Sequence, residues 1–197
     1  MAALTGPAKA QPVPGMGTTA EDLNFAVGHL RKSRLVFIGA INGLTEAQWR
    51  FKPAPDRWSI AECAEHLAIA EEELLRMVRG ASIEPLAEGT KLPGKAFDRE
   101  LLSIYLNRST KAQASEILKP TGRWKDQDSL RKDFWQMRSD TIRFAETIPI
   151  NLRERGFMHT MLKRPLDCVQ WLLVMSAHTE RHTLQIEEVK ASAGYPR

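Results

Sequence analysis

Four long segments of this chain repeat their apolar residues every three or four positions, which is the period of one face of an α-helix. The segments span roughly residues 19–43, 59–79, 129–148 and 167–193. No stretch between them alternates apolar and polar residues as a convincing β-strand does. Helices with one apolar face bury that face against one another, so the sequence predicts an all-α protein built as a four-helix bundle.

Local signals place the ends of the second and fourth segments. Ser59 is followed three residues later by Glu62, and Asp167 by Gln170. This spacing is typical of a capping box, in which two side chains close the first turn of a helix. Gly80 predicts the end of the second helix, because glycine readily adopts the backbone conformation that ends one.

Residues 81–128, between the second and third helices, form a crossover that is too long for a tight helix hairpin. Its length allows these two helices to run parallel, which gives an up-down-down-up order. The crossover contains one short predicted helix, residues 98–106, and then an irregular basic segment, residues 111–125. The loop 149–165 carries His159, which we expect to be exposed to solvent. Long connections often line a functional site.

The 197 residues are enough for one domain with a sizeable core, and we expect this domain to cover residues 18–194. Residues 1–17 are rich in Ala, Pro and Gly and are predicted to be a disordered tail. No signal peptide or membrane-spanning run is evident, so we expect a cytoplasmic protein with no membrane partner. Cys63 and Cys168 form no CxxC pair, which argues against a disulfide framework and a cysteine-rich zinc site.

The formal net charge of +4 raises the question of nucleic-acid binding. The basic residues are scattered and often adjoin acidic ones, as in Arg153-Glu154-Arg155. No stretch interleaves them with exposed aromatic residues, which is the pattern of many nucleic-acid-binding surfaces. We therefore expect a solvated surface and no nucleic-acid partner. Nucleic-acid binding that weakens steeply with salt would contradict this expectation.

A polar stripe lies within the apolar fourth segment. His178, His182 and Gln185 are spaced four and three residues apart, so on a helix they lie one above another on one face. An imidazole removed from water without a partner costs about 1–3 kcal/mol, which suggests that something lies between the two rings. Two histidines at this spacing can bind one metal ion, although Thr179 follows the first and no HExxH motif is present. An ordinary pair of surface or core histidines is the alternative.

Three sequence features occur together in this chain. They are, in order, Trp58-Ser59-Ile60-Ala61-Glu62 leading to His66-Leu67, a crossover with Ile117-Leu118-Lys119-Pro120-x-Gly122-Arg123-Trp124, and His178-x-x-x-His182-x-x-Gln185. In these features the chain resembles the DinB/YfiT-like superfamily over roughly residues 20–190. The resemblance implies a bundle whose inner face holds a divalent metal ion on three histidines, and the matching positions are His66, His178 and His182. It also implies a small-molecule substrate, in some members used with a low-molecular-weight thiol, and a homodimer.

Three neutral imidazoles leave a tetrahedral ion with one open position, which is typical of a catalytic site rather than a structural one. Zinc is the first expectation, with nickel, iron and manganese as alternatives, because imidazole binds several ions. The ion would activate a water or a small thiol for attack on an electrophilic small molecule, which describes a hydrolase or a thiol-dependent S-transferase. The alternative is a non-catalytic, stress-related bundle that binds a metal or ligand, in which a fourth protein ligand such as Cys63 would close the coordination of the ion. A packed small hydrophobic residue is the simpler interpretation of Cys63.

Two further side chains are candidates for catalytic support around the metal. Glu62 lies one turn before His66 and is a candidate acceptor for a ligand N–H or a proton shuttle, although its capping-box role is the simpler interpretation. Gln185 is a candidate for orienting the metal-bound species, or else it caps the polar stripe near solvent. Arg164 and Arg181 are candidates for binding a carboxylate of the substrate, with surface ion pairs as the alternative.

Overall fold

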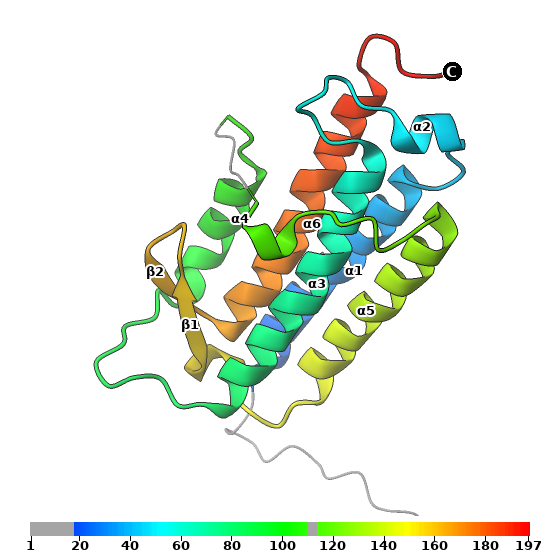
Figure 1. Cartoon of the computed structure of the whole chain (residues 1–197). Helices are drawn as coiled ribbons and strands as arrows, with labels where there is room; N and C mark the ends of the chain where they lie inside the picture. The colour runs from blue at the N-terminus through cyan, green and yellow to red at the C-terminus, as the bar shows by residue number, and fades with distance from the viewer. Residues whose placement is uncertain (1–17, 110–113) are drawn as a thin grey trace, which may run out of the picture.

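Four long helices make up the body of the protein in a computed structural model, which describes residues 18–109 and 114–197. Residues 1–17, the predicted disordered tail, lie outside the described residues. The four helices have the bounds α1 Ala20–Ala40, α3 Ile60–Ile83, α5 Gln127–Thr147 and α6 Cys168–Lys190. In Figure 1 helices α1 and α6 run upward, and α3 and α5 run downward. The prediction of an all-α four-helix bundle is confirmed.

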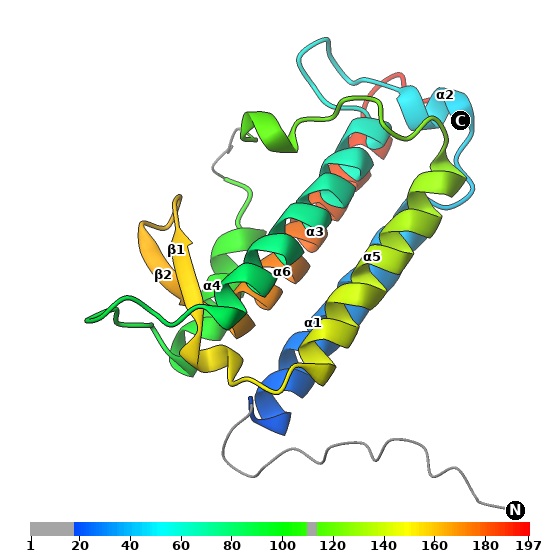
Figure 2. The same cartoon turned by 60° about the horizontal axis from the view of Figure 1, so that its bottom comes forward.

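Each long helix packs against two of the other three. Helix α6 contacts α1 and α3, and α5 contacts the same two helices, so α5 and α6 lie on opposite corners of the bundle. Figure 2 shows the two resulting pairs, α3 beside α6 and α1 beside α5. Buried apolar residues form two clusters along the bundle. One is built around Leu30, Val78 and Leu172, and the other around Phe37, Phe134 and Ile186.

A layer of buried polar side chains separates these two apolar clusters. Its centre is Arg138 of α5, which is 0% exposed and pairs with the carboxylate of Glu71 of α3 through Nε at 2.7 Å and Nη2 at 2.8 Å. The guanidinium also donates to Ser33 Oγ of α1 at 2.8 Å and to Thr179 Oγ1 of α6 at 2.8 Å. This layer, which we call the polar layer, therefore links all four long helices.

The capping boxes predicted from sequence are present at both helix starts. Ser59 and Glu62 close the first turn of α3, and Asp167 and Gln170 that of α6. The predicted end of the second helix at Gly80 is wrong, because α3 continues through that glycine to Ile83. Gly80 keeps helical geometry, and the helix ends just before Pro85, whose ring disfavours a helical residue at the position that precedes it.

The connections add short elements around the bundle. Helix α2, Glu46–Arg50, lies in the connection between α1 and α3. In the crossover, the short turn η1, Lys95–Phe97, leads into α4, Asp98–Leu106, which packs against α6 as Figure 1 shows. The later turn η2, Glu116–Leu118, lies against α3. The short helix predicted for residues 98–106 is thus confirmed, and the crossover covers the α3 and α6 side of the bundle.

The predicted loop 149–165 is wrong, because after the turn η3, Leu152–Glu154, it enters a β-hairpin. Strand β1, Gly156–His159, pairs antiparallel with β2, Arg164–Asp167, and Gly156 lies opposite Asp167. A side chain at Gly156 would meet the Leu166 carbonyl oxygen at 2.1 Å, so this close approach of two backbones requires glycine. The hairpin packs on α6 through stacked rings of Phe157 and Trp171, 4.1 Å apart.

His159 is therefore not in an exposed loop, and this prediction is also wrong. Its side chain is 4% exposed and stacks on Trp171, with ring centroids 4.9 Å apart. Its Nδ1 accepts the backbone N–H of Leu162 at 3.2 Å, and its Nε2 lies 2.5 Å from the hydroxyl of Tyr105. The hairpin buries this imidazole against the side of α6.

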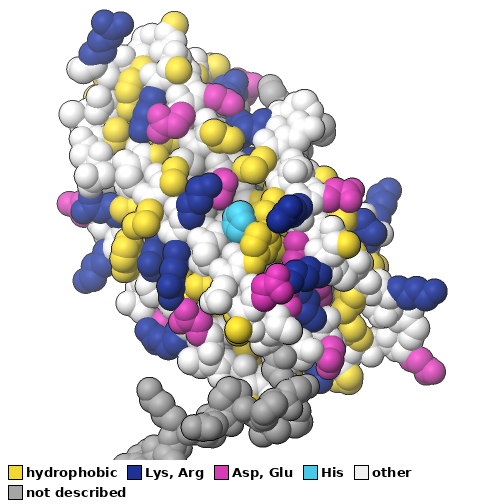
Figure 3. All heavy atoms as spheres, turned by 180° about the vertical axis from the view of Figure 1, so that it is seen from behind, with side chains coloured by type: hydrophobic (Ala, Val, Ile, Leu, Met, Phe, Trp, Pro, Cys, Tyr) yellow, Lys and Arg dark blue, Asp and Glu magenta, His cyan; other side chains and the backbone are white. Residues whose placement is uncertain are grey.

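Charged side chains are distributed over the outside of the bundle. On the face seen from behind, Lys and Arg side chains are interspersed with Asp and Glu and with hydrophobic residues (Figure 3). Exposed charges also pair with each other across helices, as Arg31 of α1 does with Glu146 of α5 at 2.7 Å. Across the described residues, no helix combines the length and the apolar character that a membrane span requires.

Candidate metal centre

Helices α3 and α6 bring three histidines together where the crossover covers them. His66 comes from α3, and His178 and His182 come from successive turns of α6. One ring nitrogen of each lies within 4.8 Å of the others, a spacing at which a single ion can contact all three. The Nε2 atoms of His66 and His178 lie 3.1 Å apart. The fold thus assembles the three residues that the resemblance to the DinB/YfiT-like superfamily selects.

The three imidazoles form a nearly regular triangle. Their ring centroids are 4.9 Å apart for His66 and His178, and 4.6 Å apart for each of the other two pairs. The indole of Trp58, just before α3, lies 5.0 Å from the ring of His66 and 6.2 Å from that of His182. His66 is 2% exposed, whereas His178 and His182 keep partial contact with solvent. The triangle therefore has an indole ring against one side, and two of its three residues are only partly buried.

Hydrogen bonds fix which ring nitrogen of two histidines remains available. The Nδ1 of His66 lies 2.7 Å from the carbonyl oxygen of Leu118 in η2. Because a carbonyl only accepts, this Nδ1 carries the proton, and the Nε2 of the neutral ring keeps its lone pair. In the same way the Nδ1 of His182 donates to Gln185 Oε1 at 2.9 Å. Both rings thus present an Nε2 lone pair.

The surroundings keep all three rings neutral. Burial lowers the pKa of His66, and the hydrogen bond to Leu118 opposes this effect only in part. Burial, followed by the neighbouring His66, lowers the pKa of His182 to about 3. Burial and the two other imidazoles hold the pKa of His178 well below its ordinary value. A neutral imidazole is the form that binds a metal ion, so at neutral pH the donor set is ready for one.

Glu62 and Gln185, the two candidates for catalytic support, differ in the partners that their side chains bind. Glu62 uses its carboxylate for the capping box, accepting the backbone N–H of Ser59 at 2.7 Å, and for an ion pair with Lys52 at 2.9 Å. These contacts favour the simpler of its two predicted roles. Gln185 lies in contact with the triangle and accepts the Nδ1–H of His182. Through this hydrogen bond Gln185 holds the orientation of the His182 ring.

Cys63 lies in the apolar cluster around Phe37 and Ile186 and is 0% exposed. Burial raises the pKa of its thiol to about 12, so the sulfur stays protonated at neutral pH. Metal ions bind the thiolate form of cysteine. In the described residues, the cluster of metal-binding side chains consists of the three histidines alone and leaves Cys63 out.

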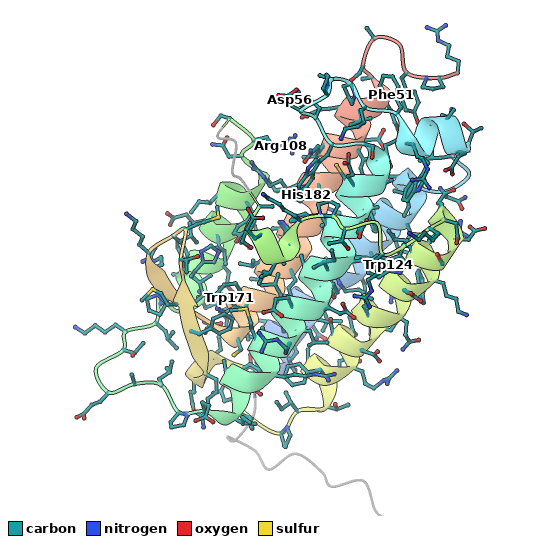
Figure 4. The ribbon with its side chains drawn as sticks, viewed as in Figure 1. Phe51, Asp56, Arg108, Trp124, Trp171 and His182 are labelled. Carbon is teal, nitrogen blue, oxygen red and sulfur yellow. The ribbon has the colours of Figure 1, made fainter. Side chains whose placement is uncertain are left out.

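The rim of the site next to α6 carries arginine side chains. Arg108, after α4, donates to both carboxylate oxygens of Glu188 at 2.9 and 2.7 Å, and its charge helps to lower the pKa of His182. Figure 4 shows Arg108 close to His182 in this view. Arg181 donates to the carbonyl oxygens of Tyr105 and Asn107 at 3.0 and 2.6 Å. Arg164 lies on β2 instead, with its guanidinium 4.3 Å from the ring centre of Phe97.

Two contributors to the site, Leu118 and Glu65, were not predicted from the sequence to be site residues. The carbonyl of Leu118 is a main-chain group, which every residue possesses, so nothing in the side chain at that position points to it. Glu65 precedes His66, is 5% exposed and accepts four hydrogen bonds from residues 121–123 of the crossover. A signal of a different kind was present in Gly122, whose backbone has φ +78°. That conformation favours glycine and marks a specific turn.

The donor set fits a divalent metal ion. It consists of three neutral nitrogens, and for His66 and His182 a hydrogen bond holds the other ring nitrogen. Catalytic zinc sites commonly use three protein ligands and leave a further position for water or substrate. Imidazole also suits nickel, iron and copper, so the donor type narrows the choice of metal without fixing it.

Comparison with known proteins agrees with this fold. The chain is 23% identical over 163 residues to the uncharacterized protein YuaE of Bacillus subtilis, covering 81% of this chain and 93% of that protein. Among solved structures it is similar to YfiT from Bacillus subtilis, with a TM-score of 0.61, 14% identity and 95% of each chain covered. YfiT is described as a probable metal-dependent hydrolase with an unusual four-helix bundle topology. The model of the DinB superfamily matches residues 29–186, and the chain therefore belongs to the DinB superfamily.

Proposed function

We propose that this protein is a metal-dependent enzyme that binds a divalent cation through His66, His178 and His182. The observation that carries the proposal is the triangle of three neutral imidazoles, with ring nitrogens within 4.8 Å of one another and with His178 and His182 only partly buried. A cation held there by three protein ligands has room for a further ligand, which a catalytic site requires. Zinc is the first choice, with nickel, iron or manganese as alternatives.

When bound, such a cation acts as a Lewis acid that polarises an electrophile and lowers the pKa of a water or thiol. The chain's own groups prepare the site for this chemistry. Leu118 and Gln185 hold two imidazoles in the tautomer that directs Nε2 inward. Trp58 covers one side with an apolar ring, which excludes water and strengthens electrostatic interactions within the site. These features support attack by a small nucleophile on an electrophilic small molecule.

Hydrolysis is the first reaction to test, because the similar structure YfiT is described as a probable metal-dependent hydrolase. Transfer to a low-molecular-weight thiol is the second. The guanidinium groups of Arg57 and Arg108 lie 3.9 and 2.7 Å from the Glu188 carboxylate at the rim, and this excess of positive charge suits an anionic cosubstrate. A homodimer completes the proposal, on the strength of the sequence resemblance alone, and the cytoplasmic location remains the expectation stated from the sequence.

Elemental analysis of the purified, tag-free protein beside His182→Ala tests the proposal. We expect near-stoichiometric metal in the parent and little in the variant. The metal-loaded parent is then assayed for hydrolysis of activated esters and amides, and for conjugation of electrophiles with thiols, with zinc, nickel and manganese in turn. A parent that stays metal-free after reconstitution with each ion would refute the metal centre.

A non-catalytic metal-binding bundle is the alternative function, and a test of Cys63 as a metal ligand distinguishes it from an enzyme. In a structural site a fourth protein ligand closes the coordination shell, and Cys63 is the nearest cysteine in sequence to His66. In the described residues the cluster of metal-binding side chains leaves Cys63 out, which argues against that role. We expect Cys63→Ala to retain full metal content. Loss of metal in a folded Cys63→Ala protein would favour the closed, non-catalytic site.

A further inference from the structure

One buried carboxylate, next in sequence to a histidine of the metal centre, holds a segment of the crossover. Glu65 Oε1 accepts the backbone N–H of Thr121 at 2.9 Å, the hydroxyl of Thr121 at 3.1 Å and the backbone N–H of Arg123 at 2.8 Å. Its Oε2 accepts the backbone N–H of Gly122 at 3.0 Å. Although Glu65 is only 5% exposed, both oxygens of its carboxylate accept hydrogen bonds.

The backbone at residues 121–123 is shaped as a cradle for an anion. Three successive N–H groups point at one carboxylate, which is the arrangement known as a nest. Gly122 makes this geometry accessible, because its φ of +78° lies in the left-handed region that glycine adopts without strain. Conversely, the Glu65 carboxylate supplies the hydrogen-bond acceptor for these three backbone N–H groups of the crossover.

The same segment supplies the acceptor for His66. Residues 116–124, which we call the strap, include Leu118, whose carbonyl oxygen lies 2.7 Å from His66 Nδ1. Only Lys119 and Pro120 separate this carbonyl from the nest, and the proline ring restricts the backbone between them. Two neighbouring residues of α3 thus contact the strap at two points a few residues apart.

We propose that Glu65 is a positioning residue of the metal centre, which places the Leu118 carbonyl against His66 and so fixes the tautomer that directs His66 Nε2 inward. A neutral imidazole that loses this acceptor can carry its proton on either nitrogen, and only one of the two forms offers Nε2 to a metal ion. The strap thereby acts as part of the metal centre. The metal-affinity part of this inference rests on the proposed function, whereas the tautomer part does not.

Glu65→Gln is the first test, because it keeps the size of the side chain but replaces an acceptor by an amide donor that faces the N–H groups of the nest. Nitrogen NMR of the metal-free protein reports the tautomer of His66. We expect the parent to show Nδ1–H and the variant to populate Nε2–H as well. Backbone amides of residues 121–123 should exchange with solvent faster. In the metal-binding arm, cobalt or zinc affinity should fall by about 10- to 100-fold, the usual effect of losing a group that orients a ligand.

Glu72→Gln is the matched control. Glu72 holds the same strap through Arg123, at 2.5 and 3.1 Å, but this ion pair is about half exposed and lies farther along α3. The substitution makes the same change of charge and leaves the nest intact. We expect the tautomer of His66 to stay as in the parent and metal affinity to change less than twofold.

Gly122→Val is a second variant, which disturbs the nest from the strap and leaves α3 unchanged. A Cβ at Gly122 meets no atom within 4 Å, so the substitution acts only through the strained backbone. It should shift the tautomer as Glu65→Gln does, and it decides the question if Glu65→Gln does not fold. A folded variant with unchanged tautomer and exchange would overturn the proposal. A parent that binds no metal would instead refute the proposed function, while the tautomer and exchange results would still decide the role of Glu65.

Discussion

His66 and His178 lie 112 residues apart in the sequence, and their Nε2 atoms lie 3.1 Å apart in the fold. His178 is also one turn from His182 on the same helix, so two of the proposed ligands are close in sequence and the third joins them only when α3 packs on α6. Metal binding at this triangle should therefore be coupled to the packing of the bundle.

Metal should stabilise the folded protein. A ligand that binds only the folded state adds RT ln(1 + [L]/Kd), which is about 4 kcal/mol at a free metal concentration one thousand times Kd. We expect thermal unfolding of the chelator-treated protein to shift upward on addition of zinc. His182→Ala should lose this shift while keeping a cooperative transition. An equal shift in the parent and in the variant would place the metal elsewhere.

Acid should destabilise the metal-free protein through the same histidines. The folded-state pKa of His182 is about 3, below the ordinary value near 6.5, so the unfolded chain binds more protons between these values. The contribution of neutral His182 to the free energy of unfolding is therefore fully present above about pH 6.5. As the pH drops below that value, the free energy of unfolding falls by up to about 1.4 kcal/mol per pH unit for each such histidine. Urea unfolding at pH 7.5 and 5.0 measures this slope. His182→Asn should make the slope shallower, and an unchanged slope would contradict the assignment.

Removal of Glu71 should strongly destabilise the bundle. Glu71→Ala leaves the guanidinium of Arg138 buried without its carboxylate, a change that typically costs about 3–5 kcal/mol. Chemical denaturation measures the loss. Glu146→Gln, which breaks the exposed pair with Arg31, is the control and should leave stability almost unchanged. A double variant, Glu71→Leu with Arg138→Met, should recover much of the loss, because no unpaired charge remains.

Gln185 should affect metal affinity through His182. Gln185→Ala removes the acceptor 2.9 Å from His182 Nδ1, and we expect metal affinity to fall by about tenfold or more. Gln185→Glu keeps an acceptor at this position and should bind metal at least as tightly as the parent. Competition with a chromophoric chelator gives both affinities. If Gln185→Ala binds as tightly as the parent, Gln185 only caps the polar stripe.

Tyr105 should contribute to stability and not to metal content. His159 Nδ1 accepts from Leu162, so its Nε2 carries the proton and donates to the Tyr105 hydroxyl at 2.5 Å. Tyr105→Phe leaves this buried N–H without an acceptor, at a cost of about 1–3 kcal/mol. Thermal melting and elemental analysis of the variant check the two halves of this prediction. Loss of metal would connect the hairpin to the metal centre.

Local signals explain which parts of the fold are readable from sequence. The pairs Ser59 with Glu62 and Asp167 with Gln170 act within one helical turn, so their spacing predicted both helix starts. Gly80 misled, because tertiary packing carries α3 through it. The sequence did not predict the hairpin because its strands have only four residues each, too few to show an alternation of apolar and polar residues. In addition, β2 contains Pro165.

The metal centre was readable only in part. The four-residue spacing of His178 and His182 is a local signal of a shared helix face. His66 has no such local signal, and only the resemblance to the DinB/YfiT-like superfamily identified it as a candidate metal ligand. The contacts that orient the rings depend on the crossover, where a carbonyl of Leu118 and the nest at Gly122 come from the course of the main chain. Side-chain patterns do not encode that course.

The polar layer also sets how far the helices can slide along one another. Arg138 reaches its partners on α1, α3 and α6 at one height of the bundle, between two apolar clusters. Displacing α3 by one turn, about 5.4 Å, would leave the charges of Arg138 and Glu71 facing hydrocarbon. The same displacement would move His66 relative to His178 and His182 by more than 4.8 Å, the distance within which the three ring nitrogens now lie. A salt bridge outside the cluster of three histidines thus holds the axial register at which the three imidazoles meet.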